Sequence, residues 1–273
     1  MSPDSAPPAG ALAGDVAVEV SPGYVATVEL RRPPDNFFDV AMIRALADAY
    51  HALDDDPACR VIVLCAAGKH FCAGANLGPA EPAAPSGRPA SPLGVVSELY
   101  AEAVRLFEAR TPVIAAVQGA AVGGGLGLVL SADFRVASPG SRFSANFARL
   151  GFHHGFALGV TLPALAGQQT ALDLLLTGRR VAGEEARSLG LCDRLVDDAE
   201  IRTEAHALAA ELAQSAPLAV RSIRATLRTG LLERVEAALE REAFEQDRLR
   251  ATADFREGVT ASLERRAPRF HGS

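Results

Sequence analysis

The sequence predicts an α/β fold in which a buried sheet is followed by a helical C-terminal region. Unbroken apolar runs at 60–67 and 112–117 are typical of strands buried on both faces. Helical patterns separate these strands, and such alternation favours ββα-type repeats. From Val160 onward the apolar spacing is helical. About half of the 273 residues are hydrophobic, so a sizeable core can be buried.

The first elements are two short strands and a helix. The runs at 16–20 and 24–30 are rich in Val and are separated by a Ser-Pro-Gly turn. Asp39 can cap a helix that extends from about Val40 to Leu53, because apolar residues recur there at helical spacing. We therefore expect a β-hairpin that leads into an amphipathic helix.

The middle of the chain continues this pattern around a proline-rich segment. Residues 78–92 hold five prolines and predict a mobile loop. A helix is expected to end near Arg110, and a second one, after a glycine cluster, near Leu130. The run at 134–138 predicts the next strand.

The last part of the chain predicts helices. Residues 199–216 are amphipathic, and Pro217 suits the first turn of a further helix. Residues 231–266 are rich in Glu, Arg, Leu and Ala. A charged helical segment of this kind packs on its own core or on a neighbouring subunit.

Composition excludes several classes of protein. The net charge of −6 argues against a nucleic-acid-binding surface. The four cysteines have no CxxC spacing and are not paired with histidines in a metal-binding pattern, so we predict no metal site and a cytoplasmic protein with reduced, buried thiols. The N-terminus lacks the features of a signal peptide. The uncharged stretch 111–132 is interrupted by glycines, so we predict no membrane span.

Two glycine-rich turns stand out as a candidate site. "GKHFCAGANL" (68–77) and "VQGAAVGGGLGLVL" (117–130) each follow an apolar strand. The first N–H groups of a helix have no internal partner, and small residues let a ligand approach them. Side by side, the two turns would form an oxyanion hole. They could equally be two ordinary strand-to-helix turns, and no GxGxxG, P-loop or GxSxG motif is present.

These two motifs resemble those of the crotonase family, the enoyl-CoA hydratase/isomerase superfamily. The segment "RRPPDNFFD" (31–39) and the helical stretch at 171–196 also resemble that family, and the likeness covers about residues 15–270. The resemblance implies a crotonase-like ββα superhelix with a helical C-terminal trimerisation region. It also implies homotrimers, often paired into hexamers as dimers of trimers.

The expected domain boundaries and the expected ligand can also be stated. Residues 1–14 are expected to form a disordered tail. The resemblance implies a core with an acyl-CoA site at 15–198 and a helical oligomerisation region at 199–273. The ligand is an acyl-CoA thioester, so coenzyme A is expected as part of the substrate and no separate cofactor is expected. The backbone N–H groups of Ala75 and Gly124 would hold the thioester oxygen.

Both carboxylates that the hydratases of this family use are missing. The corresponding positions hold Gly127 and Phe147, neither of which can transfer a proton. Asn76 stands where the family has Asp, at a turn-forming position. The usual two-glutamate addition of water is therefore not expected.

A pair of histidines offers an alternative acid or base. His153 and His154 lie between Gly151 and Gly155, near the acyl pocket according to the resemblance. Histidine titrates near neutral pH and suits proton transfer. They could instead hydrogen-bond the backbone of the turn, and nothing in the sequence chooses between them.

The expected contacts to coenzyme A are spread over several residues. The resemblance points to five of them as candidates: Arg32, Lys69, His70, Ala73 and Leu77. Arg32 and Lys69 would meet phosphates, and His70 is expected beside the coenzyme rather than at the reacting carbon. Each cation is otherwise an ordinary surface charge.

Two functions remain open from the sequence. The first is an acyl-CoA-processing enzyme, a lyase or isomerase, or else a hydrolase or decarboxylase, with a thioester enolate in a backbone oxyanion hole. The second is a non-catalytic acyl-CoA-binding protein that kept the fold. Gly127 and Phe147 favour the second function, whereas the intact glycine motifs favour both.

Overall fold

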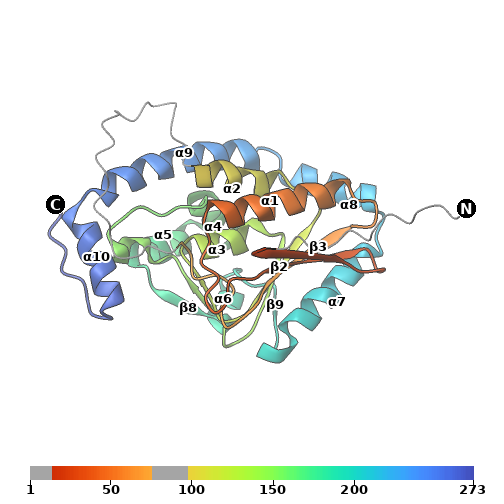
Figure 1. The fold of residues 1–273 in the computed structure, drawn as a ribbon, viewed down its shortest axis with the longest axis horizontal. Coiled ribbons are helices and arrows are strands. Elements are labelled where there is room, and N and C mark those ends of the chain that lie inside the picture. Colours follow the sequence, from red (N-terminus) through yellow and green to blue (C-terminus); the bar gives the residue numbers. More distant parts are fainter. Residues whose placement is uncertain (1–13, 76–97) are drawn as a thin grey trace, which may run out of the picture.

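The computed structural model describes residues 14–75 and 98–273, and it confirms the predicted α/β fold (Figure 1). The predicted tail at 1–14, except for Gly14, and the predicted loop at 78–92 lie outside the described residues. The main sheet has six strands in the order β1-β2-β3-β4-β6-β9. These strands are β1 (Val16–Val20), β2 (Val25–Leu30), β3 (Val61–Ala66), β4 (Val113–Val117), β6 (Phe134–Ala137) and β9 (Arg194–Leu195).

The order of the strands determines where the glycine-rich turns lie. Strands β1 and β2 are antiparallel, and every later neighbour in this sheet is parallel, including β3 with β4. The C-terminal ends of β3 and β4 therefore meet at one edge of the sheet. Each of the two turns follows one of these strands, so both leave the sheet at the same edge.

A second sheet of three short strands was not predicted. Its strands are β5 (Ala120–Val122), β7 (Arg142–Ser144) and β8 (Arg180–Ala182). Only two residues separate the end of β4 from the start of β5. Strand β5 extends the chain between the main sheet and the helix α3 (Gly124–Ser131), and so presents the second glycine-rich turn.

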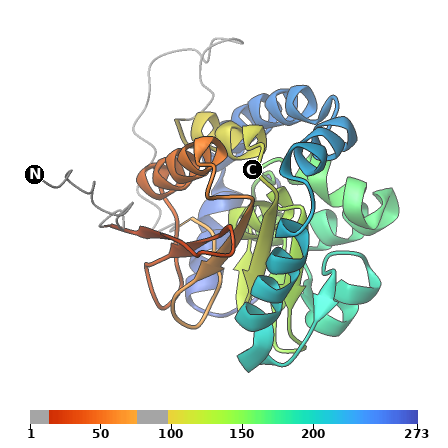
Figure 2. The same ribbon diagram turned by 90° about the vertical axis from the view of Figure 1, so that its right-hand side faces the viewer.

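Helices cover both faces of the main sheet (Figures 1 and 2). On one face lie α1 (Val40–Asp55) and α2 (Glu98–Glu108), and on the other α7 (Ile201–Ala213). Successive residues of β3 alternate between these faces: Ile62 and Leu64 belong to the main core, whereas Val61, Val63 and Cys65 pack towards α7. This double burial explains why the strand is apolar throughout.

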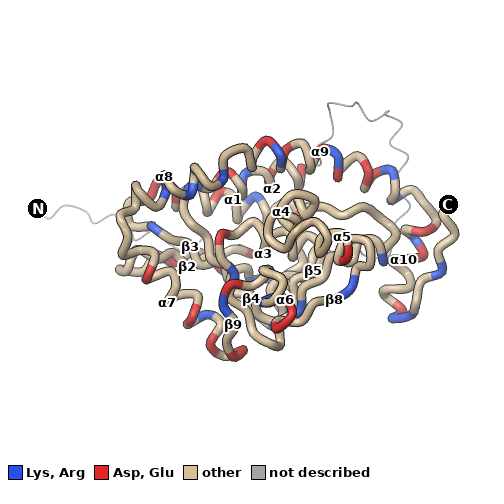
Figure 3. The backbone as a smooth tube through the Cα atoms, turned by 180° about the vertical axis from the view of Figure 1, so that it is seen from behind, with Lys and Arg blue, Asp and Glu red and all other residues tan. Residues whose placement is uncertain are grey.

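The remaining α-helices belong to the second half of the chain. The predicted helical segment at 231–266 consists of two helices, and Pro217 begins a helix as expected. The long helix α9 packs against α2 and α4. Charges of both signs are interspersed along α9 (Figure 3). These helices are α4 (Leu158–Ala166), α5 (Gln168–Thr177), α6 (Gly183–Ser188), α8 (Pro217–Leu227), α9 (Leu231–Arg250) and α10 (Ala253–Leu263).

Several local predictions are confirmed. The Asp39 carboxylate accepts a hydrogen bond of 2.9 Å from the N–H of Met42 and caps α1. All four cysteines are buried and free of disulfides. Within residues 14–75 and 98–273, no helix is long and apolar enough to cross a membrane.

Candidate active site

The two glycine-rich turns lie side by side. The N–H of Cys72 donates to the carbonyl of Ala120 (3.1 Å), and the N–H of Val122 donates to the carbonyl of Cys72 (3.0 Å). The backbones approach so closely that a Cβ on Gly74 would stand 2.8 Å from the carbonyl oxygen of Val122. Gly74 also has φ +90°, which strains any other residue. Glycine is therefore required here for the two turns to meet.

The structure brings together the two predicted donor residues, Ala75 and Gly124. Gly124 is the first residue of α3, so its N–H has no acceptor inside the helix. A Cβ on Gly74, the residue before Ala75, would lie 3.9 Å from the nitrogen of Gly124. Both Ala75 and Gly124 line a cavity of about 490 Å³. The geometry thus places two backbone amides next to a space that can hold a ligand.

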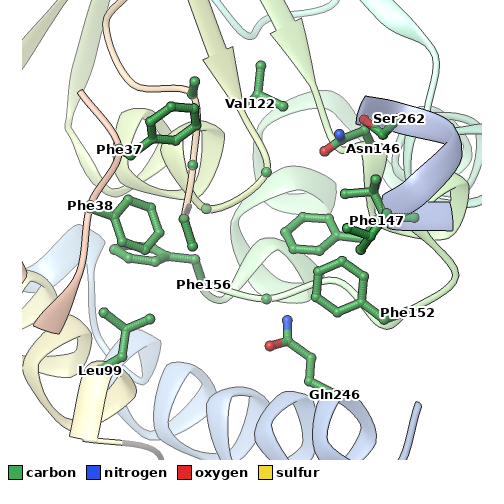
Figure 4. Close-up of a pocket in the computed structure, with 18 of the residues that line it drawn as sticks. Phe37, Phe38, Leu99, Val122, Asn146, Phe147, Phe152, Phe156, Gln246 and Ser262 are labelled. Atoms are coloured by element: carbon green, nitrogen blue, oxygen red, sulfur yellow. The ribbon is translucent and has the colours of Figure 1, made fainter. Parts of the chain in front are cut away.

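The cavity is mainly aromatic and aliphatic (Figure 4). Its walls come from the segment before α1, from α2, η1 (Asn146–Leu150), the following turn, α9 and α10. Among the described residues that line it, Arg250 carries the only charge, and none has a carboxyl or imidazole group. The polar side chains in the lining are Tyr100, Asn146, Gln246, Arg250 and Ser262.

The two positions where the family resemblance places glutamates, Gly127 and Phe147, differ in environment. Gly127 is covered by Phe156, because a Cβ on Gly127 would stand 2.5 Å from the Cβ of Phe156. Phe147 lines the cavity and is 6% exposed. An aromatic side chain therefore occupies the space at each position where the family resemblance places a carboxylate.

The rings of His153 and His154 do not line the cavity. They stack on each other with centroids 4.1 Å apart. Nδ1 of His153 lies 2.8 Å from the carbonyl oxygen of His154, and Nε2 of His154 lies 3.4 Å from Oε1 of Glu242 on α9. The structure therefore places the two rings with α9, behind the turn that forms the cavity wall. Their proposed role in catalysis stays a prediction.

Glu242 of α9 hydrogen-bonds the backbone of this turn on the side away from the cavity. Its Oε2 accepts a hydrogen bond from the N–H of Ala157 (2.9 Å), the residue before α4. Burial raises the pKa of Glu242 to about 8, and burial lowers the pKa of His154 to about 4, so both groups are neutral at neutral pH. A neutral pair fits the low polarity around it. Phe156 and Ala157, which Glu242 supports, both have positive φ.

Sequence reasoning missed Glu242 and Gln246, although their spacing could have revealed them. Val235, Leu239, Glu242 and Gln246 recur at intervals of four, three and four, which places them on one face of α9. All four are buried. A polar residue within an apolar helical stripe was the available signal.

The candidate contacts to coenzyme A are spread around the first turn. Arg32 forms ion pairs with Asp15 (2.5 Å) and Asp39 (2.8 Å), so two carboxylates already compensate its positive charge. Lys69 is exposed, and Nδ1 of His70 accepts a hydrogen bond from the N–H of Ala120 (3.1 Å). Ala73 lines the cavity, whereas Leu77 and Asn76 lie outside the described residues.

Comparisons with known proteins agree with this geometry. The family model of enoyl-CoA hydratase/isomerase matches residues 21–273. The chain is 33% identical to the 1,2-epoxyphenylacetyl-CoA isomerase of Escherichia coli, over 91% of this chain and 96% of that protein. It is 36% identical to the carnitinyl-CoA dehydratase of Salmonella arizonae, over 76% of this chain and 78% of that one.

A solved structure resembles the whole fold. The enoyl-CoA hydratase/isomerase of Pseudoalteromonas atlantica superimposes with a TM-score of 0.82 at 31% identity, over 94% of this chain and all of that one. The fold is thus that of the crotonases, and the glycine-rich turns lie within the matched region. This chain belongs to the enoyl-CoA hydratase/isomerase family.

Proposed function

We propose that this member of the family binds an acyl-CoA and holds the thioester oxygen between the N–H groups of Ala75 and Gly124. The observation that carries this proposal is the close pairing of the two turns through Cys72, next to a cavity that both amides line. Two convergent donors favour charge on that oxygen, as forms in a thioester enolate. Losing one such donor typically costs about 10²–10³ in rate.

The same site argues against water addition by two glutamates. Gly127 is packed under Phe156, and Phe147 fills the other position. Neither side chain can take a proton from water or return one. We therefore infer an enolate reaction in which the described cavity wall supplies donors but no carboxylate.

Among the reactions that the sequence leaves open, decarboxylation fits this lining best. The bond between C2 and a carboxylate breaks, carbon dioxide leaves, and the electron pair passes into the thioester as an enolate. Water then returns a proton to C2. No protein base is needed to form the enolate, and Arg250 provides a cation in the lining that can hold the substrate carboxylate before it leaves.

A second candidate function is acyl-CoA binding without turnover. It is favoured by one observation: among the described residues, no carboxyl or imidazole group lines the cavity. Proton transfer by His153 or His154 would require their rings to turn from α9 towards the cavity.

A homotrimer, or a dimer of trimers, remains part of the proposal. Helix α8 supports it, because Leu218, Ile223 and Leu227 on this helix are 61–82% exposed. An apolar surface of this kind is typical of a covered interface. Light scattering of the purified protein measures the state directly.

The experiment for the proposed function follows the absorbance of a short 2-enoyl-CoA while coenzyme A binding is measured in the same sample. We expect binding without rapid loss of the conjugated double bond. A malonyl-type thioester with a substituent at C2 should lose carbon dioxide if the chain is a decarboxylase, and should only bind if it is not an enzyme. Rapid formation of a 3-hydroxyacyl-CoA would contradict the proposal.

A further inference from the structure

Phenylalanine dominates the cavity walls. Five of the chain's 12 phenylalanines line the space, although aromatic residues make up only 5% of the chain. They come from three separate segments: the stretch before α1, the η1 helix and the turn before α4. These five residues are Phe37, Phe38, Phe147, Phe152 and Phe156.

Four of these rings form two fixed pairs. Phe38 and Phe156 are tilted at 56° with centroids 5.6 Å apart. Phe147 and Phe152 are tilted at 58° with centroids 5.3 Å apart, and Phe152 packs further on Phe255 of α10 (5.2 Å). Because each ring rests on another one, the walls are rigid rather than free to collapse into the cavity.

The two pairs flank the amide of Gly124. A Cβ on Gly124 would stand 2.9 Å from Cε1 of Phe38 and 3.5 Å from Cδ2 of Phe156. A Cβ on the neighbouring Gly123 would stand 3.6 Å from Cζ of Phe147. Figure 4 shows Phe38 and Phe156 on one side of the space and Phe147 and Phe152 on the other. A carbon chain attached to a thioester at Gly124 would therefore enter between aromatic walls.

The size of the space fits a ring. An apolar cavity of roughly 150 Å³ is large enough to bind benzene. The cavity here is about 490 Å³, which leaves room for the thioester as well. A flat ring between two tilted pairs can meet ring edges and ring faces on both sides, and such contacts add to the gain from burial alone. A saturated group of the same size is stabilised by burial, but it lacks the electrostatic attraction between aromatic ring edges and ring faces.

We propose that the acyl group of the substrate carries an aromatic ring next to the thioester, and that Phe147 is a specificity-determining residue for it. This inference rests on the proposed function, because it assumes that the thioester lies at Ala75 and Gly124. Phe147 replaces a carboxylate that the family resemblance expects. The same substitution that removes hydratase chemistry thus completes the aromatic wall.

The test compares three thioesters with the same number of carbon atoms: phenylacetyl-CoA, cyclohexylacetyl-CoA and octanoyl-CoA. Calorimetry should show that phenylacetyl-CoA binds roughly 3–10-fold more tightly than cyclohexylacetyl-CoA. Phe147→Leu should abolish this preference, because a leucine fills space without a ring. Phe244→Leu makes the same change at an exposed position of α9 and should preserve it.

A second variant and two further comparisons complete the test. Phe152→Leu provides a second ring deletion if Phe147→Leu does not fold, and circular dichroism checks each variant. Equal or tighter binding of cyclohexylacetyl- or octanoyl-CoA overturns the inference, as does a preference that survives both variants. Acetyl-CoA compared with its thioether analogue tests the proposed function separately, because neither compound carries a ring. If no CoA compound binds, both proposals fail.

Discussion

Gly127 of α3 lies directly beneath Phe156, with only 2.5 Å between the Cβ of Phe156 and the position that a Cβ on Gly127 would take. The carbonyl oxygen of Phe156 would be 2.8 Å from the same position. These are backbone and near-backbone atoms, so a side-chain rotation cannot relieve the clash. No larger side chain therefore fits at Gly127, one of the two positions where the family resemblance places a glutamate.

This contact predicts that the missing carboxylate cannot be restored by substitution. Gly127→Ala should lower the free energy of unfolding by about 1–3 kcal/mol, the usual cost of overpacking, even though alanine favours helix. Gly127→Glu should cost at least as much, because it also buries a charge. Urea denaturation measures both. Gly23→Ala is the control, since a Cβ there meets nothing closer than 3.8 Å. Hydration of a 2-enoyl-CoA by the Gly127→Glu, Phe147→Glu double variant would contradict this interpretation.

The buried pair behind the cavity predicts how stability depends on pH. The pKa of Glu242 is raised from 4.5 to about 8, so the folded state keeps a proton that the unfolded state releases, and stability falls as pH rises between these values. The pKa of His154 is lowered from 6.5 to about 4, so stability rises with pH across that lower range. The two effects oppose each other below pH 6.5.

Of these two groups, only Glu242 contributes between pH 6.5 and 8. We expect the free energy of unfolding to fall there by at most about 2 kcal/mol, and Glu242→Gln to flatten this slope. Glu240→Gln makes the same change at an exposed position of α9 and should leave the slope unchanged. A slope that persists in Glu242→Gln would show that another group titrates in this range.

The single lysine of the chain allows a direct test of the coenzyme site. Lys69 is exposed beside the first glycine-rich turn. An amine-directed reagent should therefore modify Lys69, apart from the N-terminal amine, and bound coenzyme A should protect it. Lys69→Ala should weaken binding only a few-fold, since an exposed ion pair contributes about 0–1 kcal/mol, while Lys69→Arg keeps the charge. Mass spectrometry of the labelled peptide is the measurement, and unprotected labelling at saturating coenzyme A would place the phosphates elsewhere.

The orientation of the two histidines predicts a small effect of removing them. Losing a general acid or base typically costs about 10²–10⁴ in rate. Because neither ring lines the cavity, His153→Ala and His154→Ala should each stay well below that range for any acyl-CoA that reacts. Steady-state kinetics at saturating substrate gives the comparison. A loss within that range, in a variant that binds the thioester normally, would restore the histidines as catalytic residues.

The sequence revealed those parts of the site that depend on local chain geometry. Gly74 and Gly124 both lie in glycine-rich segments that follow an apolar strand, and Gly124 begins α3; this pattern is visible in a few consecutive residues. Parallel pairing of β3 with β4 then brings the turns together, as expected for neighbouring strands. The α/β fold followed from short-range signals of this kind, whereas Ala75 and Gly124 were identified as donors through the family resemblance.

The rest depends on contacts between distant segments. Strands such as β5 and β7 have only three residues, too few for a periodic pattern. The covering of Gly127 by Phe156 requires a turn with positive φ that Glu242 of α9 supports from far along the chain. The direction in which His154 points is set by the same helix. No short sequence motif predicts any of these contacts.

The oxyanion hole is tested most directly by the infrared absorption of acetyl-CoA labelled with carbon-13 at its thioester carbonyl. If the N–H groups of Ala75 and Gly124 both donate to the oxygen, the carbonyl stretch of the bound thioester will move to a lower wavenumber than in water, because the two donors weaken the C=O bond. A stretch at the same or a higher wavenumber would mean that the carbonyl lies in the apolar cavity without donors. That result would contradict the oxyanion hole on which the proposed function depends.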